Sequence, residues 1–247
     1  MGFTERTNQI MAILGKQGSI QVSQLETLLQ VSPVTIRKDL QRLEDMGKLM
    51  RTHGGAALPG PRIPRDPRTD AMEAIAEKAA AQVEEGDWVI LNAGNTTLLT
   101  ARKLADKRIT IITNSIPIAR ELADREKIKL IFLGGEINPE GGFTYGWDAV
   151  TQLEQYKANK LILSVSGLSA GAGLTTRHME AADLLRKMVQ RTQTVIAVAD
   201  DTKIGFESFC HVCDLGKVDL LLTNPTPATE SQLETLGQRN IRILRCE

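Results

Sequence analysis

Residues 31–44 read VSPVTIRKDLQRLE, and this stretch predicts a helix with a clear start and two unlike faces. Ser32 followed by Pro33 is typical of a helix start, because serine accepts hydrogen bonds from unpaired N–H groups and proline is tolerated at the first helical position. The helix should end near Met46, because Gly47 can adopt the left-handed conformation that closes a helix. The N-terminal part of the chain is organised around this segment.

The two faces of this helix differ in chemistry. Ile36, Leu40 and Leu43 recur at helical spacing and form one stripe suited to burial. The other faces carry hydroxyl, amide and basic side chains, namely Thr35, Arg37, Lys38, Gln41 and Arg42. Arginine can pair with guanine and glutamine with adenine in the major groove of DNA, while lysine and threonine can bind phosphate. We therefore expect this helix to contact DNA, beginning at Ser32 and Pro33.

Two shorter helical patterns precede it. Residues 4–16 place apolar side chains at helical spacing and end before Gly18. Residues 23–26 read SQLE, which predicts a capping box with Ser23 at the start of a second helix. The leucines that this second helix should bury are Leu25, Leu28 and Leu29. Two short helices, a tight turn and a third helix with a basic face predict a helix-turn-helix at about residues 20–39, extending to 46.

A wing should follow the third helix. Residues 48–55 read KLMRTHGG, which alternates like a short hairpin strand and ends in glycines. Arg51 and His53 would then be available to the DNA backbone or minor groove. The alternative is a solvated amphipathic helix in a three-helix bundle, because charge on an exposed face often means only solubility. We expect residues 1–58 to form this winged domain.

Charge is distributed unevenly along the 247 residues, although the net charge is zero. Residues 1–65 carry nine lysines and arginines against five acidic residues, and the remainder carries twenty-one against twenty-five. A basic N-terminal part on an acidic body favours contact of that part with a polyanion. Double-stranded operator DNA is the expected partner.

The cysteines and the hydropathy pattern indicate the cellular compartment in which the protein is expected. An odd number of cysteines and no signal peptide predict a reducing cytoplasm. Cys210 and Cys213 have CxxC spacing but lack a second pair of ligands, so we expect no metal site. No apolar run is long enough to cross a membrane. We also expect no cofactor and no catalytic residue.

Residues 59–70 contain four prolines and predict an extended linker. After it, residues 71–247 begin with a helix rich in alanine and then alternate apolar runs with helical patterns. The candidate strands are residues 88–92, 109–113, 129–133, 161–165, 194–199, 220–223 and 241–244. Continuous apolar strands between helices predict an α/β domain with a mostly parallel, doubly wound sheet.

Polar and glycine-rich segments follow several of these strands. Ligands in such folds bind beyond the carboxyl ends of the strands. Residues 93–97 read AGNTT and lead directly into a helix, whose free N–H groups favour a small anion such as phosphate. Lys203 is the only lysine at these strand ends and could neutralise a phosphate. Each junction alone could be an ordinary turn or cap.

The N-terminal motif, including RTHGGA at residues 51–56, closely resembles the signature of DeoR-type transcriptional regulators. The segments AGNTT, TNS (113–115), LGG (133–135), GLTT (173–176) and DDTKIG (200–205) resemble the sensor domain of the same family. That domain is similar in fold to ribose-5-phosphate isomerase and generally binds phosphorylated sugars or related metabolites. The resemblance implies a repressor of a carbohydrate-utilisation operon that is controlled by such an effector.

The resemblance also implies which residues form the effector site. These are Gly94, Asn95, Thr96, Thr97, Asn114, Ser115, Gly135 and Lys203. The sequence departs from the family pattern at Asn92, Asn95, Ser166 and Leu185, where an aspartate, a threonine, an aspartate and a lysine are usual. A homo-oligomer, dimer or tetramer, is expected because one short helix-turn-helix reads too few base pairs.

Two other functions stay open from the sequence. A sugar-phosphate isomerase-like enzyme with an accessory DNA-binding domain would need a carboxylate base, and Asp200, Asp201 and Glu180 are the candidates. Alternatively, the larger domain binds no ligand and serves only for oligomerisation. Turnover of phosphorylated sugars would support the first, and the absence of any ligand-induced stabilisation would support the second.

Overall fold

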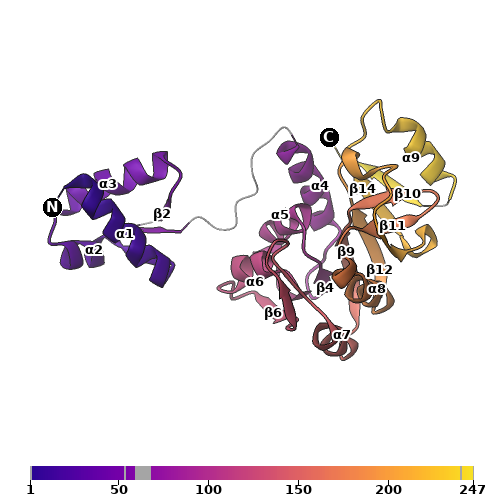
Figure 1. Ribbon diagram of the computed structural model, residues 1–247, viewed down its shortest axis with the longest axis horizontal. Helices are drawn as coiled ribbons and strands as arrows, with labels where there is room; N and C mark the ends of the chain where they lie inside the picture. The colour runs from indigo at the N-terminus through magenta and orange to yellow at the C-terminus, as the bar shows by residue number, and fades with distance from the viewer. Residues whose placement is uncertain (1, 53, 59–67, 240, 247) are drawn as a thin grey trace. The chain divides into compact units, whose positions relative to one another are not determined.

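The computed structural model describes residues 2–52, 54–58, 68–239 and 241–246. The chain forms two compact units, Met1–Arg62 and Ile63–Glu247, which are considered separately here (Figure 1). The helix α4 (Thr69–Ala81) begins within the segment predicted as a linker, and residues 59–67 of that segment lie outside the described residues.

The first unit combines three helices with a small antiparallel sheet (Figure 1). Its elements are α1 (Phe3–Gln17), β1 (Ser19–Gln21), α2 (Val22–Leu29), α3 (Pro33–Asp45), β2 (Met50–Thr52) and β3 (Gly55–Ala57). The sheet has the order β1-β3-β2, so the predicted wing is present as β2 and β3. The predicted end signals also hold, since Gly18 and Gly47 have positive φ angles of 73° and 68°.

One core holds this unit together. The stripe predicted on α3 is buried, with Ile36 and Leu40 at 0% and Leu43 at 1% exposure. It packs against Ile10 and Leu14 of α1 and against Leu25 of α2, among others. The packing of this stripe fixes the orientation of α3. The core therefore determines where the exposed face of the helix points.

Two local predictions in this unit need correction, and one strand was missed. The capping box does not start at Ser23, because α2 begins one residue earlier and the backbone N–H of Gln21 donates to Gln24 Oε1 at 3.1 Å. Leu28 is 58% exposed rather than buried, since it lies on the outer side of the short α2. Strand β1 was not predicted. It pairs with β3 at Gly55, where a Cβ atom would lie 2.2 Å from the carbonyl oxygen of Ile20.

The second unit is built on a seven-stranded parallel sheet, as predicted. Its strands are β4 (Trp88–Leu91), β5 (Ile109–Thr113), β6 (Ile128–Phe132), β9 (Ala158–Ser164), β12 (Thr192–Val198), β14 (Leu220–Thr223) and β15 (Arg242–Arg245). Their order is β15-β14-β12-β9-β4-β5-β6, and every adjacent pair is parallel. All seven predicted strands are therefore present, with ends shifted by up to three residues.

Helices cover both faces of this sheet, which confirms the doubly wound prediction. One face packs with α4, α5 (Asn95–Leu104) and α6 (Ile116–Leu122), and the other with α7 (Trp147–Glu154), α8 (Ala182–Gln190) and α9 (Glu230–Gly237). Successive strand residues alternate between the two cores: Val89 and Leu91 face one, and Ile90 faces the other. This explains why the strands are apolar throughout.

Short antiparallel strands lie outside the main sheet and were not predicted. β7 (Glu136–Asn138) pairs with β8 (Phe143–Tyr145), and β11 (Gly173–Thr176) pairs with β10 (Gly167–Ser169) and β13 (Cys210–Cys213). The remaining elements are single 3-10 turns at Met179–Ala181, Asp201–Lys203 and Leu215–Lys217. These short strands mix glycine and polar residues with apolar ones, so they lack the continuous apolar runs that predict the strands of the main sheet.

Candidate functional sites

The first candidate site is the outward face of α3. Arg37 and Lys38 are exposed, and neither makes a side-chain hydrogen bond or ion pair with another described residue. Ser32 accepts from the backbone N–H of Thr35 at 3.4 Å, and the two hydroxyl groups lie 3.0 Å apart. Ser32 and Pro33 therefore form the helix start as predicted, and Thr35 takes part in the cap. The basic side chains one turn later are left available to a partner.

Further along α3 the polar side chains bind one another. Arg51 from the wing donates through Nη1 to Gln41 Oε1 at 2.7 Å, and Gln41 Nε2 donates to Asp45 Oδ1 at 3.0 Å. The backbone N–H of Arg51 also donates to Glu44 Oε1 at 2.9 Å. These contacts join the wing to the C-terminal half of α3, so Arg51 and Gln41 are not independent groups as the sequence suggested.

One other predicted DNA contact, Arg42, packs against a neighbouring helix. The guanidinium of Arg42 lies 5.0 Å from the ring centroid of Phe3, so Arg42 packs against α1 at the flank of the exposed face. His53 lies outside the described residues. Asp39, which is 2% exposed, accepts from Arg6 Nε at 2.6 Å, and this ion pair ties α3 to α1.

The second candidate site is a cavity of about 770 Å³ in the larger unit. It lies at the carboxyl ends of β4, β5, β9 and β12 and is centred where β4 meets β9. The strand order reverses at that point: β5 and β6 extend to one side of β4, and β9, β12, β14 and β15 to the other. Ligands of open α/β sheets bind in the crevice at such a switch point.

The loop between β4 and α5 forms one wall of the cavity. Asn92 is 3% exposed, and its side chain makes two hydrogen bonds of 2.8 Å with the backbone N–H and C=O of Ser164 at the end of β9. A Cβ atom on Gly94 would lie 2.7 Å from Ser164 Oγ, so glycine allows the loop to approach β9. The first N–H groups of α5, including those of Asn95 and Thr96, have no partner within the helix and favour an anion.

Cationic side chains and a histidine also line the cavity. Lys203 lines it and has no side-chain partner among the described residues. Arg177 and His178 also line it, with Arg177 Nε and His178 Nε2 3.3 Å apart. Asp200 is 8% exposed and accepts from the backbone N–H of Thr202 at 3.0 Å, so one of its carboxylate oxygens is occupied in the turn.

Five of the eight residues predicted for the effector site line this cavity, and three do not. Those that line it are Gly94, Asn95, Thr96, Asn114 and Lys203. Thr97 is fully buried and donates to the carbonyl oxygen of Asn92. Ser115 caps α6 by accepting from Ile118 at 3.3 Å. Gly135 has φ +124°, and a Cβ atom there would lie 2.4 Å from the carbonyl oxygen of Tyr145, so its role lies in the turn before β7.

Several cavity residues were missed, and the departures from the family pattern lie beside them. Arg177, His178, Ser164 and Ser208 are brought to the cavity by β11, β9 and the segment before β13. The sequence contains RH directly after GLTT, which was the one available signal. The departures at Asn92, Ser166 and Leu185 all fall on lining residues. They change the chemistry of the cavity wall itself.

Metal binding and membrane insertion find no support in the described residues. Residues 2–52, 54–58, 68–239 and 241–246 contain no cluster of histidine, cysteine or acidic side chains that could hold a metal ion. No helix in these ranges is long and apolar enough to cross a membrane. Burial raises the pKa of the Cys213 thiol to about 11, which makes it a poor metal ligand or nucleophile at neutral pH.

Comparison with known proteins covers both units. The model of the DeoR-like helix-turn-helix domain matches residues 6–62, and the model of the DeoR C terminal sensor domain matches residues 68–225. The HTH-type transcriptional repressor GlcR of Bacillus subtilis is 35% identical over 250 residues, covering 98% of this chain and 96% of the relative. The glycerol-3-phosphate regulon repressor of Escherichia coli is 27% identical over 98% of this chain and 99% of its own length.

Among solved structures, ribose 5-phosphate isomerase A from Methanocaldococcus jannaschii is similar to part of the chain. The sequence identity is 15%, the TM-score is 0.41, and the similarity covers 55% of this chain and 54% of the isomerase. The curated relatives GlcR and the glycerol-3-phosphate regulon repressor, in contrast, match over 98% of this chain, which includes both units.

Proposed function

Since this chain belongs to the DeoR family of transcriptional regulators, we propose that it represses a carbohydrate-utilisation operon and that a phosphorylated sugar or related metabolite controls its binding to operator DNA. The membership expected from the N-terminal motif and the strand-end segments is confirmed, and the protein is a DNA-binding regulator. The names of the GlcR and glycerol-3-phosphate regulon relatives support repression and a phosphorylated effector.

The observation that carries the effector proposal is the cavity where β4 meets β9. The free N–H groups at the start of α5 lie on one wall, and Lys203 and Arg177 line the same cavity. A helix N-terminus and two cationic side chains together favour a dianionic phosphate. An effector can act only by binding two conformations with different affinity, so we expect it to change the affinity for DNA.

A thermal-shift screen of the purified full chain with sugar phosphates, sugar acids and inorganic phosphate tests this proposal. A ligand at one hundred times its Kd should add about 2.7 kcal/mol to the free energy of unfolding. Lys203→Ala should abolish the shift. Lys129→Ala, which removes an exposed lysine from the edge strand β6, is the matched control and should preserve it. No shift with any of these compounds would contradict the effector proposal.

The DNA contacts are tested by binding to a promoter fragment. We propose that Arg37 and Lys38 contact DNA directly, while Arg51 acts together with Gln41. Arg37→Ala should abolish specific binding with the fold intact, and raising the salt concentration should weaken binding steeply through counterion release. An unchanged sequence preference in both Arg37→Ala and Gln41→Ala would contradict the assignment of α3 as the recognition helix.

We infer that the protein is not an enzyme, in preference to the isomerase-like alternative. A carboxylate base is needed for isomerisation, but the side chains of Asp200 and Glu180 are engaged within the protein, and Asp201 does not line the cavity. Their engagement supports a binding site rather than a reactive one. Turnover of any phosphate in the same panel would overturn this inference.

We also propose a cytoplasmic homo-oligomer, a dimer or tetramer. Operators commonly pair two half-sites, and one short recognition helix reads only one of them. The three cysteines are free thiols, which supports a reducing compartment. Light scattering of the full chain, with and without a bound operator duplex, measures the stoichiometry, and a monomer in both states would contradict the proposal.

A further inference from the structure

The outward face of α3 divides into an occupied half and an unoccupied half. Val34, Arg37, Lys38 and Gln41 follow one another at helical spacing on this face. In the C-terminal half, Gln41 binds both Arg51 and Asp45. In the N-terminal half, no side-chain hydrogen bond or ion pair involves Arg37 or Lys38 among the described residues. The unoccupied half is the one that reaches base edges in helix-turn-helix proteins.

Val34 is the unexpected residue in this half. It is the second residue of α3, directly after Pro33, and its side chain is 61% exposed. The buried side of the helix is already formed by Ile36, Leu40 and Leu43 and needs no contribution from Val34. An apolar, β-branched side chain in the first turn of a helix gains nothing from exposure to water or from helix propensity. Its position is explained if a partner covers it.

We propose that Val34 reads the C5-methyl group of a thymine in the major groove. The inference rests on the proposed operator binding by α3. A thymine presents a methyl group at the edge of the major groove, and apolar side chains recognise it by direct contact. Arg37 and Lys38, one turn further along the same face, supply the polar contacts on either side. Val34 therefore adds sequence preference without adding charge.

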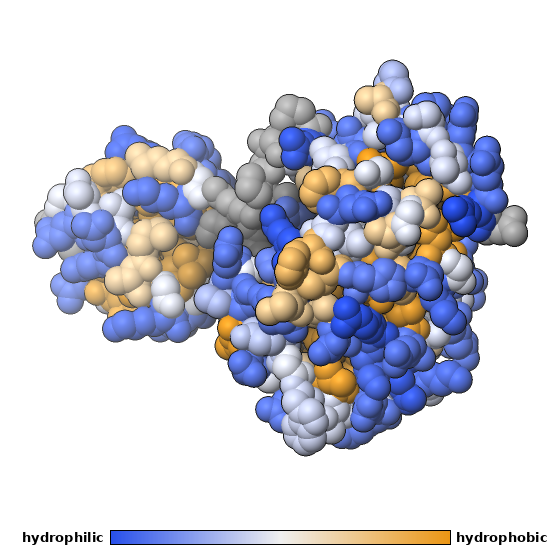
Figure 2. All heavy atoms as spheres, turned by 45° about the vertical axis from the view of Figure 1, so that its right-hand side comes forward, coloured by the Kyte–Doolittle hydropathy of each residue, from blue (hydrophilic) through white to orange (hydrophobic). Residues whose placement is uncertain are grey.

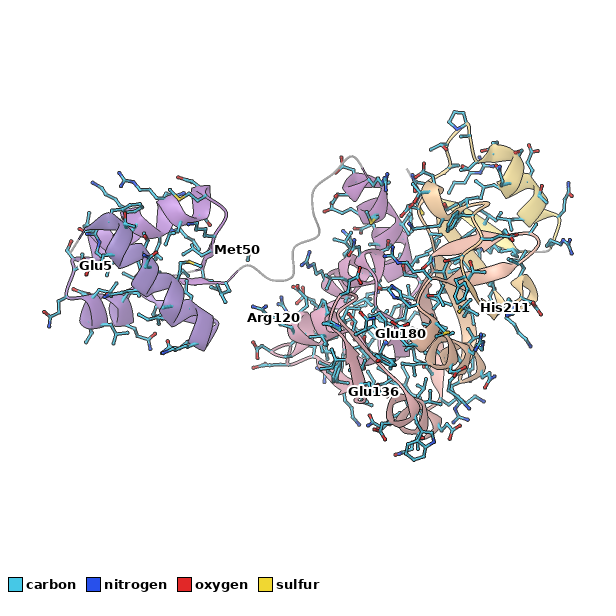
Figure 3. All side chains as sticks on the ribbon, viewed as in Figure 1. Glu5, Met50, Arg120, Glu136, Glu180 and His211 are labelled. Atoms are coloured by element: carbon cyan, nitrogen blue, oxygen red, sulfur yellow. The ribbon has the colours of Figure 1, made fainter. Side chains whose placement is uncertain are left out.

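Other exposed apolar side chains in this unit do not fit the same role. Leu28, 58% exposed, belongs to α2, and Met46, also 58% exposed, follows the last residue of α3. Met50, which is 51% exposed, lies on the wing strand β2 (Figure 3). Figure 2 shows that apolar surface is scattered among hydrophilic side chains in this unit, so exposure alone does not mark a contact. Only Val34 combines exposure with the first turn of α3.

The test replaces thymine by uracil, which lacks only the methyl group. The purified full chain first selects its preferred duplex from a random pool, and each thymine of that duplex is then replaced in turn. Wild-type protein should lose about fourfold in affinity at one thymine of each half-site, since a buried methyl group is worth about 0.8 kcal/mol. Val34→Ala should bind the thymine and uracil duplexes equally, with an unchanged dependence on salt. Leu28→Ala is the matched control and should keep the wild-type loss.

The outcomes separate this inference from the proposal on which it rests. Enrichment of no duplex would contradict operator binding itself. Enrichment followed by no loss at any uracil would leave operator binding standing and overturn the role of Val34. An equal loss at the same uracil in wild type and Val34→Ala would also overturn it, because the methyl group would then be read by another side chain. Circular dichroism of Val34→Ala checks that the helices are retained.

Discussion

In Met1–Arg62 the candidate DNA contacts lie on the outside of one helix, whereas in Ile63–Glu247 the candidate effector contacts line a cavity at the ends of several strands. The first arrangement requires only that α3 be held in place by a single small core. The second requires loops from β4, β9, β11 and β12 to meet. The first site therefore depends mainly on which side chains α3 carries. The second depends mainly on where the backbone places loops that are distant in the sequence.

The two units also differ in how they are stabilised. The smaller one has one core beneath α3, and domains of about 60 residues bury a limited fraction of their surface. The larger one has a core on each face of its sheet. A single core substitution should therefore remove the function of the first unit more easily than that of the second.

The largest effect is expected from Leu40→Ala. Leu40 is fully buried beneath the outward face of α3, and such a truncation costs about 2–5 kcal/mol. We expect specific DNA binding to be lost, while the unfolding transition of the larger unit stays in place in calorimetry. Leu236→Ala makes the same truncation in α9 and should shift only the transition of the larger unit. A single transition moved by both variants would show that the units do not unfold separately.

Thiol reactivity should report on the larger unit alone, because all three cysteines belong to it. A pKa of about 11 instead of 9 leaves Cys213 with about one hundredth of the ordinary thiolate fraction at pH 8. Burial also raises the pKa of Cys246, so half-exposed Cys210 should be alkylated first. Mass spectrometry after a timed pulse of iodoacetamide measures the order. Fast labelling of Cys213 in native protein would contradict its burial.

A smaller loss is expected from Asn92→Asp. The substitution removes the donor to the carbonyl oxygen of Ser164 and buries a charge, which should cost the larger unit about 1–3 kcal/mol. Urea unfolding followed by circular dichroism measures it. Asn95→Asp makes the same chemical change at an exposed helix start, where a negative charge is favourable, and should not lower stability. Equal stability of Asn92→Asp and wild type would show that the contact between β4 and β9 is not needed.

The smallest effect is a dependence on pH. Two hydrogen bonds to the carboxylate of Glu180 lower its pKa. One comes from the backbone N–H of Glu180 itself, and the other from the side-chain amide of Asn138. Glu180 lies between β11 and α8, facing the β7–β8 hairpin (Figure 3). A lowered pKa contributes stability above the ordinary value of 4.5 and loses it as the pH falls through the folded-state pKa.

Glu180→Gln should therefore lower the melting temperature at pH 7, where the carboxylate contributes its stability, and change little near pH 3, so that the fall between these two pH values becomes flatter. The measurement is differential scanning fluorimetry between pH 3 and pH 7. Asp183→Asn removes an exposed carboxylate from α8 and serves as the matched control. An identical acid profile for Glu180→Gln and wild type would contradict the contribution of this carboxylate.

Features that depend on neighbouring residues could be predicted from the sequence, whereas features that depend on distant segments could not. The start of α3, its buried stripe and all seven parallel strands follow from local patterns, because helix caps and continuous apolar runs are written in neighbouring residues. The buried position of Gly55 against Ile20 and the exposure of Leu28 were not predictable, since both depend on which distant element packs there.

The same limit applies to the candidate sites. Arg37 and Lys38 could be assigned to an exposed face from helical spacing alone. The pairing of Arg51 with Gln41 depends on the return of the wing to α3, which no spacing shows. Gly135 belongs to a family motif but lies in the turn before β7, against the carbonyl oxygen of Tyr145, and does not line the cavity.

By itself the sequence determined the family, the two kinds of domain, the helix α3 with its two unlike faces and the set of parallel strands, because each of these depends on residues close together in the chain. Only the tertiary structure decided that Asn92 fastens β4 to β9, that Arg177 and His178 join Lys203 around one cavity, and that Val34 stands uncovered beside Arg37. Those facts depend on strand order and on the packing of distant segments, and strand order is a property of the whole sheet.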